Sequence, residues 1–525
     1  MMFEQPRLLQ ARSDGPKPIS RRGFLNAVGA AIPAAAGSSS PRAPLPNLIV
    51  ILADDLGYGD VGVYNPDSKI PTPNIDRMAQ EGVRFVDAHT PSAVCSPTRY
   101  GLLTGRYAWR SELKKGVLWP WDKPLIEKNR LTLPAMLKRV GYHTACLGKW
   151  HLGWEWPTVD GSRINDVVRI GDPQQALRQE FSRKVVFSAA VREGPTTRGF
   201  DYYFGDDVPN FPPYSFIEND RLLSQPTAQK PDSMFGWPGP MTPGWRLESV
   251  LPEITRRAVN YVKERSQKAS PYFLYFALTS PHTPIAPEDR FRGKSSAGQY
   301  GDWVYQTDWC VGQVLEAVRA SGQASNTIVF FTSDNGPETL TYPLLKEYGH
   351  ASQGALRGAK RMLWEGGHRV PFVAWAPGRI RPGRVEEEII CLTDLFATIA
   401  ALVGYRVPED AAEDSYDIGP ALFGTKRSGR AIREATVHHS MNDEYALRQG
   451  DWVLVDSPHG EHGNGEPAWW RERFGIPKPT GPELFNLKED LRQAKNLYNR
   501  YPDRVSRMRA LLERYKLEGK SVRRG

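Results

Sequence analysis

Apolar and amphipathic stretches alternate along most of the chain. Four predominantly apolar stretches predict strands that are buried in a parallel sheet: residues 47–53, 142–147, 272–278 and 327–331. Amphipathic stretches between and around them predict helices: residues 73–81, 133–140, 252–265 and 302–320. The alternation predicts an α/β fold, with a large and mostly parallel central sheet covered by helices on both faces.

The regular pattern is interrupted between residues 154 and 245, where proline, glycine and aromatic residues dominate. A long irregular segment with many aromatic side chains predicts a folded binding loop.

The pattern changes again after an apolar helix predicted at 394–403. Short strand-like pieces follow, at residues 435–438, 445–448 and 452–456. Residues 483–519 predict a linker and a charged amphipathic helix. We therefore expect a small α+β subdomain with an antiparallel sheet at the C-terminal end.

Composition sets broad limits on the class of protein. The chain has 525 residues, of which 40% are hydrophobic and 11% aromatic, as in globular proteins with two or three domains. The formal charge of +9 is a mild bias that is compatible with anionic substrates. Basic and aromatic residues form no alternating array, so we expect no nucleic acid partner.

Residues 1–36 are similar to a twin-arginine export signal. The pair Arg21-Arg22 precedes a weakly apolar run, rich in alanine and glycine, that ends near Ala36. This run is too short for a permanent membrane helix and no later run is long enough, so we expect no stable membrane span. We therefore expect an exported protein, either periplasmic or secreted.

The four cysteines lie far apart and show neither zinc-site spacing nor a disulfide framework: positions 95, 146, 310 and 391. At Cys95 an extended segment is predicted to turn into a helix, with Ser96 as its cap and Pro97 in its first turn. The first turn of a helix favours negative charge, and Arg99 would point back to the same place.

Polar residues follow two of the predicted strands. Asp54 and Asp55 come after the first strand, and Asp334 and Asn335 come after the strand that ends at 331. Because the carboxyl ends of parallel strands meet at one edge of a sheet, we expect these side chains to lie together. Each is also a common turn residue, but that alternative does not explain two such sites at matching strand ends. Their oxygen atoms suit Ca²⁺, with Mg²⁺ as the alternative, better than zinc.

Basic residues follow the neighbouring strands. Lys149 and His151 come after the second predicted strand, His282 comes after the third, and Lys360 lies in a later basic segment. A single such residue is usually solvated or packed. Three basic elements beside a carboxylate edge predict a cationic pocket for a tetrahedral anion.

Taken together, these motifs resemble the type I sulfatases, the formylglycine-dependent family within the alkaline phosphatase superfamily. The resemblance is carried by Cys95-Ser96-Pro97-Thr98-Arg99, Leu102-Leu103-Thr104-Gly105-Arg106, Asp54-Asp55, Gly148-Lys149-Trp150-His151, Pro281-His282, Ser333-Asp334-Asn335-Gly336 and Arg357-Gly358-Ala359-Lys360. It covers roughly residues 45 to 515 and implies the alkaline-phosphatase-like sandwich. The implied domains are a sulfatase catalytic domain at 45–429 and a C-terminal subdomain at 430–525.

The resemblance implies a modified nucleophile and a metal ion. In the family a formylglycine-generating enzyme converts the cysteine to formylglycine, and the hydrated aldehyde attacks sulfur. The implied ligands of a calcium ion are Asp54, Asp55, Asp334, Asn335 and the modified Cys95.

The resemblance also implies roles for the basic residues. Arg99, Lys149 and Lys360 would neutralise the sulfate oxygens. His282 would protonate the leaving alkoxide. His151 would help to remove the proton of the second hydroxyl of the modified residue, which expels sulfate.

Further segments resemble sulfatases close to the galactosamine-sulfatase branch, and they imply a sulfated carbohydrate or aryl sulfate substrate. The implied substrate-binding residues are His368, His438 and His439. Candidates for stacking on sugar rings are Trp154, Trp156 and Tyr214.

Two other functions fit the same scaffold. A phosphomonoester or phosphonate hydrolase would normally carry serine or threonine at position 95 and more histidine ligands, and the Asp/Asn set disfavours it. A non-catalytic, carbohydrate-binding pseudo-sulfatase is disfavoured by the intact set of site residues.

Overall fold

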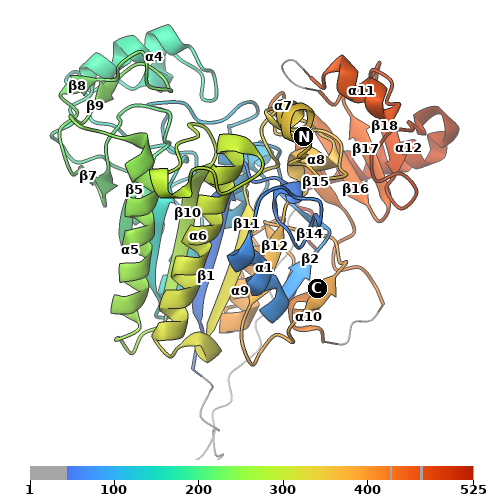
Figure 1. The fold of residues 1–525 in the computed structure, drawn as a ribbon, viewed down its shortest axis with the longest axis horizontal. Coiled ribbons are helices and arrows are strands. Elements are labelled where there is room, and N and C mark those ends of the chain that lie inside the picture. Colours follow the sequence, from blue (N-terminus) through green and yellow to red (C-terminus); the bar gives the residue numbers. More distant parts are fainter. Residues whose placement is uncertain (1–43, 426–428, 462–464, 524–525) are drawn as a thin grey trace, which may run out of the picture. The chain divides into compact units, whose positions relative to one another are not determined.

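A ten-stranded mixed sheet forms the centre of the protein, in the order β13-β2-β12-β11-β1-β10-β4-β5-β6-β7 (Figure 1). The central strands are parallel: β1 (Asn47–Asp54), β4 (His143–Lys149), β5 (Tyr202–Asp207), β10 (Tyr272–Pro281) and β11 (Thr327–Ser333). The outer strands are β2 (Val83–Phe85), β6 (Ile217–Glu218), β7 (Arg221–Leu222), β12 (Phe372–Trp375) and β13 (Arg384–Glu386). The computed structural model describes residues 44–425, 429–461 and 465–523, so the predicted export signal lies outside the described residues.

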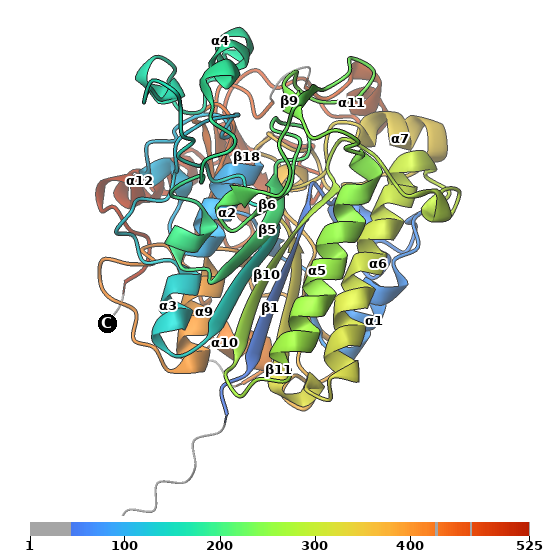
Figure 2. The ribbon, with the colours of Figure 1, turned by 90° about the vertical axis from the view of Figure 1, so that its left-hand side faces the viewer.

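Helices cover both faces of this sheet (Figure 2). One face packs against α1 (Pro73–Glu81), α5 (Val250–Arg265) and α6 (Gly298–Ala320), and the other against α2 (Cys95–Thr104), α3 (Leu133–Arg139) and α9 (Asp394–Val403). Along β1, the side chains of Ile49 and Ile51 lie on the face that α1, α5 and α6 cover. The side chains of Leu48 and Val50 lie on the opposite face, which α2, α3 and α9 cover. Each of these fully buried side chains contributes about 1.5–3 kcal/mol through the hydrophobic effect, which explains the uninterrupted apolar runs of the central strands.

A second sheet, of four antiparallel strands, lies in the C-terminal part: β15 (Thr436–His439), β16 (Tyr445–Gln449), β17 (Trp452–Asp456) and β18 (Glu483–Asn486). One face packs against α12 (Pro502–Leu517), and the other packs against Trp364 and α11 (Ala468–Phe474). The sequence predicted a linker at the start of residues 483–519, but residues Glu483–Asn486 form the strand β18, so this prediction is wrong. Four residues are too few to show the alternation of polar and apolar positions that identifies a strand. Leu484 and Phe485 alternate between the two faces of this sheet.

Segment 154–245 is folded and contributes β5 to the central sheet. Its smaller elements gather at the edge where the parallel strands end (Figures 1 and 2): α4 (Gln175–Phe181), β6, β7, β8 (Ala228–Gln229) and β9 (Pro240–Met241). The remaining elements are β3 (Ala88–His89), β14 (Ile390–Cys391), α7 (Thr341–Tyr348), α8 (Glu365–His368) and α10 (Gly419–Phe423).

The architecture confirms the predicted α/β class, with a large, mostly parallel sheet and a small C-terminal α+β part. The described residues from Leu45 onward form one compact unit. All four cysteines are buried and free. Within the described ranges, every helix falls short of the length or the apolar character needed to cross a membrane.

Candidate active site

The polar residues predicted at two strand ends meet in the structure. β1 ends at Asp54 and continues into Asp55, and β11 continues into Asp334 and Asn335. The Asp55 N–H donates to Asp334 Oδ1 at 3.2 Å, and Asn335 Nδ2 donates to Asp55 Oδ1 at 2.7 Å. Asp55 has a φ of 65°, a left-handed conformation that is costly for a residue other than glycine and that clusters at functional sites.

Cys95 is the first residue of α2 and follows Val94, whose backbone is extended. Its Sγ lies 3.6 Å from Asp54 Oδ1. The prediction that Ser96 caps the helix is wrong, because the helix already begins at Cys95. The Ser96 hydroxyl instead accepts a hydrogen bond from the N–H of Leu118 at 3.0 Å.

Each carboxylate of the site has a cation within 2.7 Å, and Arg99 also lies 3.6 Å from Asp54 Oδ1. The shortest contacts are Lys149 Nζ to Asp54 Oδ2 (2.6 Å), Lys360 Nζ to Asp55 Oδ1 (2.7 Å) and Arg99 Nη2 to Asp334 Oδ2 (2.7 Å). Buried charges need such partners, because an unpaired charge loses its hydration without compensation. The balanced set can therefore take up a divalent cation and an anionic substrate together without a large uncompensated charge.

Two histidines complete the site, and a backbone carbonyl orients each ring. His151 Nε2 lies 2.8 Å from the carbonyl oxygen of Leu118, so Nε2 carries the hydrogen and the buried Nδ1 has no partner among the described residues. His282 Nδ1 contacts the carbonyl oxygen of Thr283, and its Nε2 lies 3.8 Å from Asp55 Oδ2. Each ring thus keeps one nitrogen available for proton transfer.

Burial shifts the ionisation of these groups. Burial raises the pKa of Asp334 to about 6 and lowers the pKa of His282 to about 3. Burial also holds the pKa of His151 well below its usual value. Burial, with the charge of Asp334, raises the pKa of the Cys95 thiol. A protonated thiol is a poor nucleophile, so an unmodified Cys95 has little chemistry to offer here.

The donor atoms fit a hard cation. One possible ligand atom from each of Asp54, Asp55, Cys95 and His282 lies within 4.8 Å of the others. Asn335 Oδ1 is buried and has no hydrogen-bond partner in the described part of the chain. A buried acceptor without a partner is costly, and a cation at this position would satisfy it. Oxygen donors of this kind suit Ca²⁺ or Mg²⁺.

The site opens into a cavity of about 420 Å³, the size range of small-ligand pockets. Cys95, His151, His282 and Lys360 line it. A buried, charged site with an open cavity above it is suited to binding and cleaving an anionic ester.

Comparison with known proteins identifies the family. The sulfatase family model matches residues 46–405. The chain is 32% identical over 504 residues to an N-acetylgalactosamine-6-O-sulfatase of Bacteroides thetaiotaomicron, a match that covers 90% of this chain and 93% of the relative. This chain belongs to the sulfatase family.

Other relatives agree with this assignment. Arylsulfatase A of Bos taurus is 34% identical to the sulfatase over 485 residues, which cover 89% of this chain and 85% of the relative. A solved structure from work on the metabolism of multiple glycosaminoglycans by Bacteroides thetaiotaomicron superposes with a TM-score of 0.75 at 29% identity, covering 90% of this chain and 99% of that one. The predicted alkaline-phosphatase-like fold and sulfatase activity are thus confirmed.

The histidines predicted to bind substrate do not line the catalytic cavity of the sulfatase. His368, His438 and His439 are at most 1% exposed. His439 instead joins β15 to the segment before Cys95, since its N–H donates to the Pro91 carbonyl at 3.2 Å and its carbonyl accepts from the Ala93 N–H at 3.0 Å. Packing between α8, β3 and β15 therefore buries residues that the sequence suggested were accessible.

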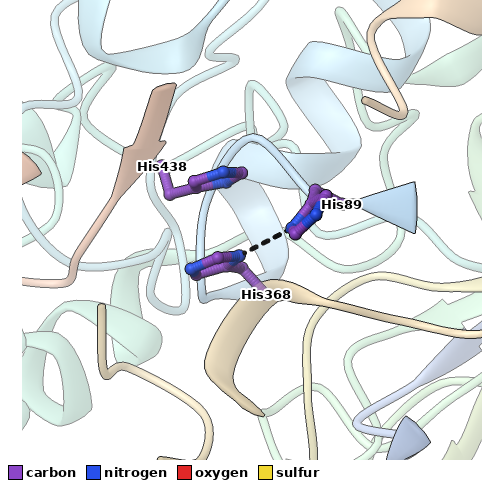
Figure 3. Close-up of side chains that lie close together, drawn as sticks. All are labelled: His89, His368 and His438. Atoms are coloured by element: carbon purple, nitrogen blue, oxygen red, sulfur yellow. Dashed lines mark hydrogen bonds between the residues drawn. The ribbon is translucent and has the colours of Figure 1, made fainter. Parts of the chain in front are cut away.

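His368 and His438 form a buried cluster with His89 (Figure 3). The rings of His368 and His438 stack with centroids 3.7 Å apart and planes 4° apart, and His89 Nδ1 lies 3.0 Å from His368 Nδ1. An ion bound by an imidazole nitrogen lies in the plane of the ring, so two parallel rings cannot share one. The cluster is a packing element of the sulfatase.

Other residues around the cavity were not found from the sequence. Trp119, Phe211 and Trp237 line the cavity, whereas the predicted stacking residues Trp154, Trp156 and Tyr214 are buried and lie outside its lining. No spacing or period in the sequence relates the three lining aromatics, because they come from separate loops.

The basic segment that contains Lys360 has two separate roles. Arg357 points away from the cavity, and its Nε lies 3.0 Å from Glu466 Oε2, with both side chains buried. Arg361 lines the cavity and pairs with Glu338. One residue therefore ties the sulfatase core to its C-terminal part while its neighbours face the site.

Proposed function

We propose that this sulfatase hydrolyses sulfate esters of a sulfated carbohydrate, and that a formylglycine-generating enzyme first converts Cys95 to formylglycine. The observation that carries the proposal is the position of Cys95, buried beside Asp54 in a cavity lined by Lys360 and two histidines. The 6-O-sulfatase relative supports a carbohydrate substrate, and galactose and N-acetylgalactosamine sulfates are the first candidates. Aryl sulfates are the corresponding artificial substrates.

Three cations hold the sulfate group in this proposal. Arg99 is fixed from two sides, by Asp334 and by the Lys149 carbonyl at 3.0 Å. Its rigid guanidinium offers hydrogen bonds in a set direction, whereas Lys149 and Lys360 each hold one carboxylate and can turn their ammonium groups to sulfate oxygens.

The histidines have opposite tasks in proton transfer. His282 presents Nε2 to the leaving alkoxide because its Nδ1 is held by the Thr283 carbonyl. A sulfate ester beside this ring favours its protonated form, which opposes the lowering of its pKa by burial. His151 presents the lone pair of Nδ1, which suits acceptance of a proton from the group at position 95.

Asp54, Asp55, Asp334, Asn335 and residue 95 would hold a cation, for which we propose Ca²⁺ with Mg²⁺ as the alternative. Bound there, the cation would neutralise negative charge that develops during sulfate transfer. Formylglycine would supply a hydrated aldehyde, with one hydroxyl for attack on sulfur and a second whose deprotonation releases sulfate.

A substrate panel tests the proposal. Sulfated saccharides, an aryl sulfate and an aryl phosphate are compared by kcat/KM, and we expect saccharide sulfates to be desulfated. A higher rate on aryl phosphate than on aryl sulfate would favour a phosphomonoester or phosphonate hydrolase. Binding of sulfated saccharide without turnover of any ester would favour a pseudo-sulfatase.

We also propose export through the twin-arginine route, with cleavage near Ala36, to the periplasm or the medium. The support is the Arg21-Arg22 pair and the alanine-rich run that follows it. The double variant R21K/R22K should remain in the cytoplasm, as measured by cell fractionation beside the parent chain. Unchanged export of this variant would contradict the route.

The domain limits, 45–429 for the catalytic domain and 430–525 for the C-terminal subdomain, also remain a proposal.

A further inference from the structure

Three aromatic side chains form a wall of the cavity next to His151: Phe211, Trp119 and Trp237. Phe211 packs edge-on against His151, with ring centroids 6.0 Å apart and planes at 81°. The rings of Trp119 and Trp237 each lie with their centroids 5.4 Å from that of Phe211. The two tryptophan rings stack on each other, with centroids 5.0 Å apart and planes 20° apart. The wall therefore begins beside His151 in the candidate active site and continues to two half-buried tryptophans.

Hydrogen bonds hold this wall in place. Trp119 Nε1 donates to the Gly171 carbonyl at 3.1 Å. The backbone N–H of Trp237 donates to the Asn210 carbonyl at 2.9 Å, and its carbonyl accepts from the Tyr214 hydroxyl at 2.6 Å. Both tryptophans are only half-buried. They therefore offer ring surface that is already in position, so little entropy is lost when a ligand binds there.

The cavity also has a polar wall, which begins at Lys360. Arg361 forms a two-point ion pair with Glu338, with Nη1 2.6 Å from Oε1 and Nη2 2.5 Å from Oε2. Its backbone is left-handed, with a φ of 76°, and its N–H donates to the Ala93 carbonyl at 2.8 Å. A strained, anchored backbone of this kind fixes where the side chain lies.

The charges on this wall are already matched. Among the described residues that line the cavity, the two with permanent positive charge are Lys360, which pairs with Asp55, and Arg361, which pairs with Glu338. Outside the sulfate position, the lining thus offers hydrogen-bond donors and acceptors but no uncommitted cation.

We infer that the two walls form a subsite for a neutral sugar ring that carries the scissile sulfate. The apolar face of the sugar packs against the free ring face of the Trp119–Trp237 stack, and its hydroxyls bond to the Glu338–Arg361 pair. A second sulfate or a carboxylate at this subsite would face Glu338 or have to displace it, so a second anion is selected against. This inference rests on the proposed carbohydrate function, and it specifies that function further: the accepted sugar carries the scissile sulfate and no second anionic group.

The first experiment measures kcat/KM for the methyl glycoside of N-acetylgalactosamine 6-sulfate and for the same glycoside with a second sulfate. We expect the wild-type protein to prefer the monosulfated sugar. W119A and W237A should each lower kcat/KM about tenfold, mainly through KM, because each variant removes either the ring that the sugar packs against or the ring that supports it. Inhibition by inorganic sulfate, which reports only the sulfate position, should not change. Trp469→Ala, at a half-buried tryptophan on α11 outside the cavity lining, is the matched control.

The second experiment uses Glu338→Gln, which keeps the shape of the side chain and leaves Arg361 with an uncompensated charge. The preference for the monosulfated over the disulfated sugar should then fall about fivefold. Glu347→Gln, at an exposed glutamate on α7, should leave this ratio unchanged. If W237A does not fold, W119A tests the loss of the aromatic wall, and W237F, which keeps an aromatic ring, should retain more of the wild-type kcat/KM than W119A.

The outcomes distinguish failure of the proposed subsite from failure of the proposed carbohydrate sulfatase function. A wild-type preference for the disulfated sugar, tryptophan variants that behave like W469A, or an unchanged ratio in E338Q would overturn the subsite while leaving carbohydrate hydrolysis in place. Turnover of aryl sulfate with no turnover of any saccharide would overturn the proposed function itself, and the subsite with it.

Discussion

The side-chain amide of Asn335 holds Asp55 with one atom and leaves the other unpaired. Its Nδ2 donates to Asp55 Oδ1 at 2.7 Å, while its buried Oδ1 has no partner in the described part of the chain. The same group can therefore position one carboxylate and offer an oxygen to a cation.

Replacement of Asn335 by alanine should weaken metal binding. The change removes a candidate ligand oxygen and also frees Asp55, so we expect the affinity for Ca²⁺ to fall at least about 10–100-fold. Elemental analysis after dialysis against limiting Ca²⁺ measures this without relying on turnover. Asp67→Ala, at an exposed carboxylate, is the control. Full metal content in N335A would contradict the proposed site.

The proposed modification of Cys95 is directly measurable. Mass spectrometry of the peptide that contains residue 95 should find formylglycine in active protein, and Cys95→Ala should abolish turnover without lowering the thermal midpoint. Cys310→Ala, at a buried cysteine on α6, should remain active. Full activity together with an unmodified thiol at position 95 would refute the proposed nucleophile.

The histidine cluster should make the protein sensitive to acid. Burial holds the pKa of His368 and of His438 well below the usual value of 6.5, so both stay neutral when folded and take up protons when unfolded. The unfolded state then binds more protons below about pH 6.5, and stability should fall as the pH falls, by about 1.4 kcal/mol per pH unit for each histidine.

Thermal midpoints measured between pH 8 and pH 5 test this expectation. His438→Gln should flatten the decline below about pH 6.5, even if the variant is less stable at neutral pH. His459→Gln, at an exposed histidine, should follow the wild-type curve. If the stability of H438Q fell with pH as steeply as that of the wild type, buried His438 would not be a source of the acid sensitivity.

The buried pair between Arg357 and Glu466 should stabilise the attachment of the C-terminal part. Arg357→Ala leaves two buried carboxylates, Glu466 and Glu483, without their cation and should cost about 3–5 kcal/mol. Arg509→Ala breaks a partly exposed pair with Asp456 and should cost about 1 kcal/mol or less. Denaturant unfolding of both variants gives the comparison, and equal losses would contradict it.

The sequence predicted those parts of the site that lie next to strand ends. Runs such as residues 47–53 identify buried parallel strands, and the geometry of a parallel sheet then brings Asp54 and Asp334 to one edge. The argument needs only local patterns and one rule of topology, which is why the carboxylates, Lys149 and His282 were all found.

The walls of the cavity could not be predicted in this way. Trp119 and Trp237 meet because two irregular segments fold over the same edge, and no local pattern encodes that contact. His368 and His438 were predicted to bind substrate, but the structure buries both side chains. They stack on each other where a one-turn helix and a short strand from distant parts of the sequence meet. Burial of this kind depends on tertiary packing.

The pairing of β15 with the segment before Cys95 has a consequence for biogenesis. His439 lies more than three hundred residues after Ser92, whose hydroxyl donates to the His439 carbonyl at 2.8 Å. The pocket around Cys95 therefore closes only after nearly the whole chain has left the ribosome, and in the closed state Cys95 is 1% exposed. An enzyme that modified this residue would have to act before β15 docks beside the segment that precedes Cys95. Because the twin-arginine route carries folded proteins, maturation of an exported chain would have to be complete before it leaves the cytoplasm.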